Sequence, residues 1–377
     1  MKVMMKRMAI LLAVFILALS LLACTGKVSA GTEQVELVLD HEEELQYATR
    51  FTLTRYEGGY SAFTIPGIDD RKFLIVPEGK KVPDSFSENT VILQQPVNRI
   101  CYSSGSLASL AEALGAMDSF ATVSIEKENW ALESVIRGME DGSIRFSGSY
   151  KTPDFEILLD EGVQLDIDTS MLVSHPDIQK KYEELGIPYL IEDSSKEQHP
   201  LGRLEWIKLL GAILGKDEEA AAYFEAQVEK VRALEGMEGS GKTAALFYIG
   251  ERATYVRNAG DYTTAMLNLA GGRSITAGLG IGQGGNTKMD FEEFYVQCKD
   301  ADYLFWIIMS CPCETIDELI EYNSVFADFK AVQNGNVYTS KPGFAQRTAD
   351  IVDVILEWNQ IFSDPSIEET ETFVKLR

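Results

Sequence analysis

The N-terminal third of the chain alternates apolar and polar residues with the two-residue period of β-strands. Residues 51–56 and 60–65 are two such runs, and they flank Glu57-Gly58-Gly59, which predicts a hairpin. Two further short strands are predicted at residues 72–76 and 90–94. The chain from residue 32 to about residue 96 is therefore predicted to be a β-rich extension packed on the domain that follows.

After this extension, short apolar runs alternate with helical patterns. The pattern predicts strands at residues 99–102, 120–125, 165–169 and 189–191, and helices at residues 107–114 and just before Gly186. A glycine directly after a helix, followed by Pro188, is the expected stop signal. Repeated β-α units imply parallel sheets with helices on both faces.

Residues 217–234 form the clearest long helix, because apolar side chains recur there at helical spacing. Beyond it we predict strands at residues 244–249, 303–309 and 336–339 and a last helix at residues 348–362. The two halves also share a local pattern, since Pro153-Asp154-Phe155-Glu156 matches Met289-Asp290-Phe291-Glu292. The predicted fold class is α/β, with two Rossmann-like lobes of mainly parallel sheet joined by one long rigid helix. A ligand cleft is expected between the lobes.

These patterns divide the chain into five predicted segments. In order they are a signal segment at 1–23, a tether and the β-rich extension at 24–96, an N-terminal lobe at 97–215, a linker helix at 216–235 and a C-terminal lobe at 236–377.

The first segment has the layout of an export signal. Three basic residues precede an apolar run at residues 8–23, which is too short for a typical spanning helix. The run ends in Leu21-Leu22-Ala23-Cys24, which resembles the lipobox of bacterial lipoproteins. That resemblance implies acylation of Cys24 and a protein anchored to the outer face of the cell membrane. The alternative is cleavage after Ala30, which would release a soluble protein.

Composition then removes several classes of function. The chain has 377 residues, of which 58 are acidic and 34 basic, so nothing would neutralise the phosphates of a nucleic acid. Five cysteines are too few for a disulfide scaffold. Three histidines without ligand-like spacing leave little material for a zinc or manganese site.

Two motifs suggest chemistry that their context does not favour. Residues 236–243 fit the P-loop pattern, but a helix leads in and a β-type run leads out, the reverse of what phosphate binding requires. Cys311-Pro312-Cys313 lacks the two-residue spacing of a thioredoxin-type site, so buried thiols are the simpler interpretation. No Ser/His/Asp order marks a hydrolase, and an exported enzyme is kept only as the alternative from another class.

Several segments in order resemble the class III substrate-binding proteins of ABC importers for iron-siderophores, cobalamin and haem. They are residues 99–103, 113–116, 153–156, 204–211, 289–292 and 301–302, and the resemblance covers about residues 90–362. It implies two lobes on one rigid helix, modest closure on the ligand, no cofactor, no catalytic or metal site, and partners in an ABC permease with its ATPase subunits.

The resemblance also implies a docking role for one exposed glutamate on each lobe, which would meet an arginine of the permease. Glu156 and Glu292 match these positions, with Glu293 as a substitute for Glu292. A purely structural interpretation is also available, because acidic side chains are favoured in the first turn of any helix.

Aromatic and arginine side chains near the predicted strand ends are the candidates for ligand contact. They are Tyr102, Trp130, Arg145, Tyr150, Tyr255, Arg257, Tyr262, Trp306 and Phe344. For each aromatic residue, burial in the core is the competing interpretation. Arg257 is the strongest candidate, because it follows a short strand and has no acidic residue close by in the sequence to neutralise it.

Together these features predict a membrane-tethered receptor that delivers a ferric-siderophore-type chelate to an ABC permease. Cobalamin or haem is the alternative ligand. Haem would require a side chain such as tyrosine or histidine on its iron.

Overall fold

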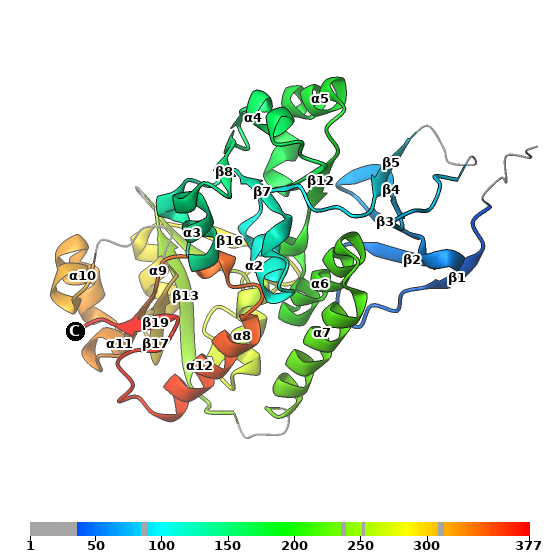
Figure 1. Cartoon of the computed structure of the whole chain (residues 1–377). Helices are drawn as coiled ribbons and strands as arrows, with labels where there is room; N and C mark the ends of the chain where they lie inside the picture. Colours follow the sequence, from blue (N-terminus) through cyan, green and yellow to red (C-terminus); the bar gives the residue numbers. More distant parts are fainter. Residues whose placement is uncertain (1–35, 84–88, 235–238, 251–252, 308–312) are drawn as a thin grey trace, which may run out of the picture. The chain divides into compact units, whose positions relative to one another are not determined.

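The computed structural model describes residues 36–83, 89–234, 239–250, 253–307 and 313–377 (Figure 1). The chain divides into two compact units, Met1–Leu37 with Lys81–Phe86 and Val38–Lys80 with Ser87–Arg377. Every helix and strand named below belongs to the second unit. The predicted signal segment and Cys24 lie outside the described residues.

The N-terminal part of this unit is a five-stranded sheet in the order β1-β2-β3-β4-β5. Its strands are β1 (Leu39–Glu42), β2 (Thr52–Tyr56), β3 (Ser61–Ile65), β4 (Asp69–Val76) and β5 (Thr90–Gln94). All pairs are antiparallel except β4 with β5. The predicted hairpin is confirmed, and its turn places Gly58 and Gly59 at φ 81° and 87°, where side chains other than glycine are strained.

A second sheet follows, with five parallel strands in the order β12-β11-β6-β7-β8. They are β6 (Ile100–Tyr102), β7 (Phe120–Val123), β8 (Arg145–Phe146), β11 (Leu165–Thr169) and β12 (Tyr189–Glu192). The connecting helices are α2 (Gly105–Ala113), α3 (Glu133–Asp141), α4 (Phe155–Asp160) and α5 (Pro176–Leu185), with a small hairpin of β9 (Gly148–Ser149) and β10 (Thr152–Pro153) before α4. As predicted, α5 ends on a left-handed Gly186.

The third sheet has seven strands and mixed directions. Its main path is β16-β14-β13-β17-β18-β19, with β15 paired to β13. The strands are β13 (Thr243–Ile249), β14 (Thr254–Arg257), β15 (Arg273–Ser274), β16 (Asn286–Met289), β17 (Tyr303–Trp306), β18 (Val337–Ser340) and β19 (Phe373–Lys375). Its helices are α8 (Tyr262–Leu269), α9 (Phe291–Cys298), α10 (Ile316–Tyr322), α11 (Lys330–Gln333) and α12 (Ile351–Ser363). The α/β class is confirmed, although β14, β16 and β19 are antiparallel to their neighbours.

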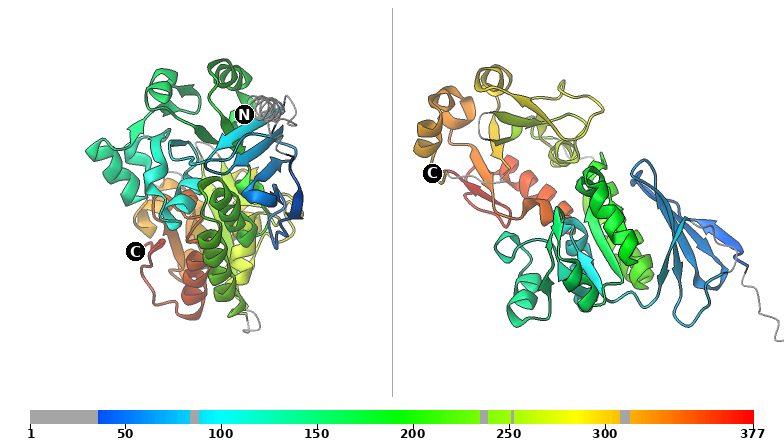
Figure 2. Two further views of the ribbon diagram at one scale, coloured as in Figure 1. Left: turned by 45° about the vertical axis from the view of Figure 1, so that its right-hand side comes forward. Right: turned by 90° about the horizontal axis from the view of Figure 1, so that it is seen from above.

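Two helices, α6 (Pro200–Leu214) and α7 (Asp217–Arg232), lie in the chain between the second and third sheets. Nearly every residue of α6 is buried. The two helices approach closely at Gly211, where a Cβ atom would come within 2.5 Å of the Ala220 Cβ. Figure 2 shows this pair beside the N-terminal sheet. The expected linker helix is thus packed against α6 and is not a free-standing rod.

One apolar core runs through the N-terminal sheet, α6, α7, one face of the second sheet and one face of the third. Alternate side chains of each α/β sheet point to separate cores on the opposite faces. On β17, for example, Tyr303 and Phe305 join the shared core, whereas Leu304 and Trp306 join the other. Each α/β sheet is therefore buried on both sides, as expected for strands flanked by crossover helices.

Polar contacts fix the segment after β18 onto the N-terminal lobe. The Gln346 amide accepts a hydrogen bond from Ala131 N at 2.9 Å and donates one to Asn129 O at 2.8 Å. Ala349 N donates to Ser109 Oγ at 3.3 Å, and Arg203 Nε donates to Thr348 Oγ1 at 3.0 Å. The two lobes consequently share a hydrogen-bonded contact near the N-terminus of α2.

Alanine substitutions at two glycines, one inside this contact and one outside it, should lower the free energy of unfolding by different amounts. Gly343 (φ 84°) and Gly335 (φ 65°) are both left-handed, but a Cβ on Gly343 would lie 2.0 Å from the Ala131 Cβ, whereas one on Gly335 would meet nothing within 4 Å. We expect Gly335→Ala to cost about 1 kcal/mol from backbone strain. Gly343→Ala should cost about 3 kcal/mol, because overpacking is added. Urea unfolding measures both, and equal losses would contradict the contact.

Candidate functional site

A polar pocket of about 460 Å³ lies where the second and third sheets face each other across α2. The N-terminal lobe contributes the β6–α2 turn and the segments after β11 and β12, and the C-terminal lobe contributes the ends of β14 and β16. The ends of parallel strands are the usual position for ligands in α/β folds. The volume lies in the range found for small-molecule and cofactor sites.

The N-terminal wall is a serine-rich turn that leads into a helix. Ser103, Ser104 and Ser106 all line the pocket, and Ser104 caps α2 by accepting a hydrogen bond from Leu107 N at 3.4 Å. Ser104 Oγ donates to Glu192 Oε1 at 2.8 Å, and Ser194 N donates to Glu192 Oε2 at 2.7 Å. The wall thus presents hydroxyl groups and the partly positive end of a nine-residue helix.

Three basic residues also line the pocket, namely Lys196, Arg203 and Arg257. Arg203 is buried, and its guanidinium lies 4.5 Å from the centre of the Tyr262 ring, within cation–π range. Arg203 also hydrogen bonds to the segment after β18, so it belongs both to the pocket and to the contact between the lobes.

Acidic groups neutralise the positive charge of Arg257 only in part. Its nearest carboxylate, Asp261 Oδ2, is 3.8 Å away, so the expectation that no acid lies nearby in the sequence is corrected. Asp261 already accepts hydrogen bonds from Thr263 N and Gly285 N at 3.0 and 2.8 Å. Arg257 Nε makes no hydrogen bond to the described residues. Arg257 therefore lines the pocket with its charge balanced by a single carboxylate at 3.8 Å.

Of the ligand-contact candidates from the sequence, Arg257 and Tyr262 line this pocket. Phe344 is buried and lines a much smaller cavity of about 10 Å³ beside Arg203 and Tyr262. The adjacent Ala345 and Gln346, rather than Phe344, reach the larger pocket.

Four candidates lie outside the described lining of this pocket. Tyr102 and Trp306 are fully buried in sheet cores, where Tyr102 stacks on Phe120 at 4.1 Å. Trp130 is buried, and its indole N–H donates to Ile125 O at 2.9 Å. Arg145 lies on the surface and forms ion pairs at 2.8 Å with Asp160 and Glu161.

The last two candidates, Tyr150 and Tyr255, do not belong to the described lining of the pocket. Tyr150 makes an edge contact with His175 at 5.6 Å. Tyr255 stacks on Tyr248 at 4.7 Å and precedes Arg257 by two residues on β14, so its side chain shares a face with Arg257. A contact with ligand stays a prediction for both.

Sequence reasoning missed the serines of the β6–α2 turn, Glu192, Lys196 and Arg203 as lining residues. For Arg203 a signal was present, because a basic residue inside an almost wholly apolar helix must find partners.

The two glutamates expected to dock the permease have closely similar settings. Glu156 lies in the first turn of α4 and Glu292 in the first turn of α9, and both are exposed. An aspartate caps each helix, with Asp154 Oδ1 accepting from Glu156 N at 3.1 Å and Asp290 Oδ1 accepting from Glu293 N at 2.8 Å. Both carboxylates are therefore presented to solvent from rigid helix starts.

Behind the pocket, two carboxyl groups are buried on β11. Asp166 accepts hydrogen bonds from Ser103 Oγ at 2.9 Å and from Tyr182 OH at 2.6 Å. Asp168 accepts one from Thr169 N at 2.6 Å, and its second oxygen makes none with the described residues. Burial, together with the nearby charge of Asp166, raises the pKa of Asp168 to about 8.

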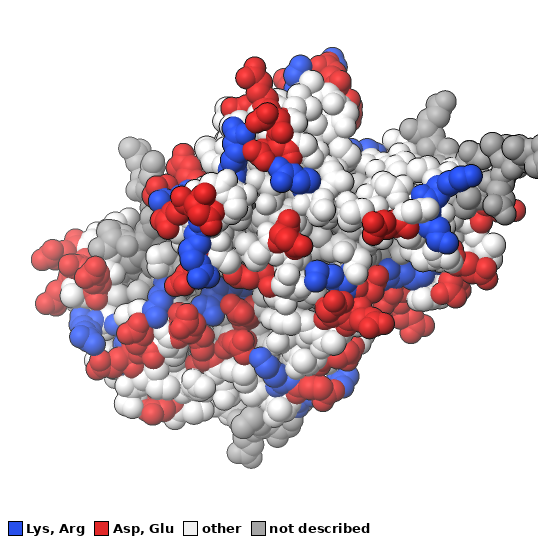
Figure 3. Space-filling model, viewed as in Figure 1, with Lys and Arg blue, Asp and Glu red and all other residues white. Residues whose placement is uncertain are grey.

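The chain as a whole is acidic, with 58 acidic and 34 basic residues. Figure 3 shows acidic side chains spread over the visible face with basic ones between them. Fields from exposed charges decay over about 8 Å at physiological ionic strength. The arginines and lysine inside the pocket therefore act on a ligand at short range, against an acidic exterior.

Metal-binding and thiol chemistry find little support in the described residues. They contain no cluster of three or more histidine, cysteine or acidic side chains placed to hold a metal ion. Cys101 and Cys298 are buried, and burial raises the pKa of the Cys298 thiol to about 12. Of the helices in the described ranges, none combines the length and apolar character needed to cross a membrane.

The sequence profile of the periplasmic binding protein family matches residues 101–343, which is more than half of the chain. The chain therefore belongs to this family, and the resemblance recognised from the sequence is confirmed. The N-terminal sheet precedes the matched residues.

Individual proteins show the same relationship. The chain is 25% identical over 293 residues to an uncharacterized lipoprotein, MJ0878, of Methanocaldococcus jannaschii, covering 73% of this chain and 68% of the relative. The fold is similar to that of a periplasmic heme binding protein from Pseudomonas aeruginosa, with a TM-score of 0.57, 17% identity and coverage of 74% and 98%. It is also similar to an ABC-type Fe3+-hydroxamate transport system protein from Saccharomonospora viridis, with a TM-score of 0.52, 17% identity and coverage of 70% and 93%.

The buried Asp168 carboxyl predicts a pH-dependent stability. Its folded-state pKa lies above the ordinary value, so its stabilising contribution is complete below pH 4 and is lost as the pH rises through 8. Asp168→Asn cannot ionise and should remove this loss, making the variant more stable than the wild type at pH 8 by about 5 kcal/mol. Urea unfolding between pH 4 and 8 measures the effect. Asp328→Asn, at an exposed site, is the control, and parallel pH profiles for wild type and Asp168→Asn would contradict the assignment.

Proposed function

We propose that this protein is an extracytoplasmic solute receptor that captures a ferric chelate and delivers it to an ABC permease. The observation that carries the proposal is the polar pocket between the lobes, lined by Lys196, Arg203 and Arg257. A binding protein needs such a cleft and no reactive group, because it releases its ligand unchanged.

The chemistry of the lining favours an anionic ligand rich in oxygen atoms. Arginine presents several N–H groups in a fixed fork that matches carboxylate and similar oxyanions. The N-terminus of α2 adds the partly positive end of a helix. The hydroxyl groups of the three pocket serines already donate to protein groups, namely Asp166, Glu192 and Ala345 O. Ferric complexes of carboxylate or catecholate chelators present this kind of surface.

Haem and cobalamin are the alternative ligands, because the fold is shared with a protein titled as heme binding. Haem iron is held by an axial side chain such as histidine or tyrosine. In the described lining the one tyrosine is Tyr262, whose ring packs over Arg203, and histidine is absent from it. This arrangement favours a chelate that arrives with its iron already coordinated.

Two simple experiments test the ligand class. A visible absorption spectrum of protein purified from its native host would show the colour of a ferric chelate, a corrinoid or haem. A thermal-shift panel of ferric citrate, a ferric tris-hydroxamate, a ferric tris-catecholate, haemin and cyanocobalamin should stabilise the protein with one of the first three. A ligand present at 100 times its Kd adds about 2.7 kcal/mol to the free energy of unfolding. A response to haemin or cyanocobalamin alone would replace the ferric chelate by that ligand.

The proposed delivery step uses Glu156 and Glu292 as the docking residues. Exposed carboxylates opposite permease arginines would steer the encounter and fix its orientation. Acylation of Cys24 would hold the receptor at the membrane next to the permease and its ATPase subunits, where the acyl chains supply the affinity.

A first prediction compares Arg257 with Arg145, the other arginine among the ligand candidates from the sequence. Arg257→Gln should weaken binding of the chelate selected by the panel about 10- to 100-fold, because it removes charged hydrogen bonds to the ligand. Arg145→Gln should leave affinity unchanged, because Arg145 pairs with Asp160 and Glu161 on the surface. Fluorescence titration gives both constants. Equal effects of the two substitutions would remove Arg257 from the binding site.

A second prediction separates docking from binding. The double variant Glu156→Lys with Glu292→Lys should abolish chelate uptake by cells while leaving the Kd within about twofold, because both side chains are exposed and lie outside the described pocket lining. Glu128→Lys with Glu321→Lys is a matched control, since it reverses one exposed glutamate on each lobe at other sites. Normal uptake by the first variant would refute the docking role.

A further inference from the structure

The loop between β1 and β2 of the N-terminal sheet has an unusual set of hydrogen-bond partners. Backbone N–H groups from Gln46 to Arg50 donate to two glutamates of the N-terminal lobe rather than to a neighbouring strand. Glu205 accepts from Gln46 N, Tyr47 N and Ala48 N at 2.8–2.9 Å. Glu197 accepts from Thr49 N and Arg50 N at 3.0 Å.

Both glutamates are buried, so these contacts matter energetically. Their exposed fractions are 0% for Glu205 and 2% for Glu197. Lys208 Nζ lies 2.9 Å from Glu205, and the Trp206 indole N–H donates to Glu197 at 3.1 Å. Residues 46–50 supply most of the hydrogen-bond donors to each carboxylate, which compensates for the burial of these two charges.

A side chain extends the same contact toward the pocket. Arg50 Nε donates to Asp193 Oδ2 at 2.7 Å, and a second guanidinium nitrogen contacts the same oxygen. Asp193 is fully buried and directly follows Glu192, which lines the pocket. Residues 49 and 50 therefore hydrogen bond to the 192–197 turn at two positions, Asp193 and Glu197.

The residues between these two points form part of the pocket wall. Ser195 and Lys196 line the pocket from a single turn, held by Lys196 N donating to Asp193 O at 3.0 Å and Glu197 N donating to Ser194 O at 3.2 Å. A turn this short takes its position from its ends. Both ends are fixed by residues 49 and 50, which lie outside the matched family region.

We propose that residues 46–50 are a positioning element of the ligand pocket, with Arg50 as its principal side chain. Arg50 touches no ligand itself and acts through Asp193 and Glu197 on the wall that carries Ser195 and Lys196. The N-terminal sheet thereby contributes to ligand affinity, and this part of the argument rests on the proposed function of the pocket.

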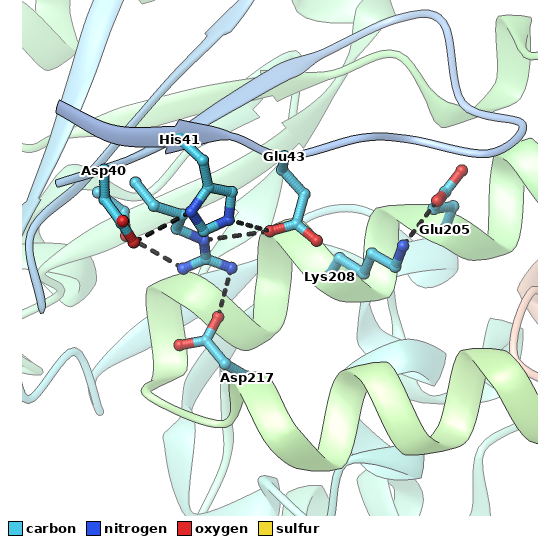
Figure 4. A network of polar contacts seen from close by, with 8 residues as sticks. Asp40, His41, Glu43, Glu205, Lys208 and Asp217 are labelled. Atoms are coloured by element: carbon cyan, nitrogen blue, oxygen red, sulfur yellow. Dashed lines mark hydrogen bonds and ion pairs between the residues drawn. The ribbon is translucent and has the colours of Figure 1, made fainter.

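The same sheet provides a matched comparison. Arg55 Nη2 lies 2.7 Å from Asp217 Oδ1, and Arg55 also pairs with Glu43. Arg55 therefore joins the N-terminal sheet to α7, and neither of its partners belongs to the turn at residues 192–197. Figure 4 shows Glu205 and Lys208 on α6 and Asp217 on α7, beside the segment that carries Asp40, His41 and Glu43. Arg50→Ala and Arg55→Ala each remove an arginine that ties the sheet to the rest of the unit, but only Arg50→Ala releases the pocket wall.

Hydrogen–deuterium exchange on the ligand-free full chain tests the proposal independently of any ligand. We expect Arg50→Ala to speed exchange of the amides at residues 194–197 at least 10-fold. Arg55→Ala should leave them within about twofold, and Arg50→Lys should restore part of the protection. Unchanged exchange in Arg50→Ala, or equal acceleration in Arg55→Ala, would overturn the proposal.

Affinity provides the second measurement, with the ferric chelates of the thermal-shift panel as probes. Arg50→Ala should raise the Kd of the chelate that binds about 10-fold, whereas Arg55→Ala should leave it unchanged. An unaltered Kd alongside faster exchange would overturn the pocket role of the wall. If none of the panel binds the wild type, the proposed function fails while the exchange result still decides whether residues 46–50 position the turn.

Discussion

The rest of the structure depends on the burial of charged side chains along α6. Arg203, Glu205 and Lys208 are at most 8% exposed, and a buried charge is tolerated only when it is paired and hydrogen bonded. Their partners come from different parts of the unit. Arg203 is bound by the segment after β18, Glu205 by the backbone before β2, and Lys208 by Glu205 and the ring of Phe224 on α7 at 4.8 Å. The charged side chains of α6 therefore connect this helix to the N-terminal sheet, to α7 and to the C-terminal lobe.

This arrangement also explains the chemistry of the pocket. Arg203 serves the contact between the lobes and lines the ligand space, so the base of the pocket cannot move independently of the core. Arg257, by contrast, comes from the end of a strand and keeps a buried nitrogen without a partner among the described residues. One arginine is thus structural and preorganised, and the other lines the pocket with its charge balanced by a single carboxylate. Preorganised donors lose little conformational freedom on binding, which favours affinity.

The sequence predicted what depends on local pattern and failed where partners are distant. The β2–β3 hairpin, the end of α5 at Gly186 and the strand β11 follow from period-two alternation and turn residues, and the structure contains them. Tyr102 and Trp306 were placed at strand ends correctly, but which face of a sheet becomes the core depends on helices far away in the chain. For the same reason the sequence did not show that Arg145 meets two acidic side chains, which α4 and the residue after it bring in.

The N-terminal sheet is therefore part of the folded core of this family member and not a separate appendage. Its apolar face joins the core that also contains α6 and one face of both α/β sheets. Its first loop supplies the donors for Glu197 and Glu205, which the region matching the family contains but does not neutralise alone. The two buried glutamates and the N-terminal sheet thus depend on each other, because the first loop of the sheet supplies hydrogen-bond donors to both carboxylates.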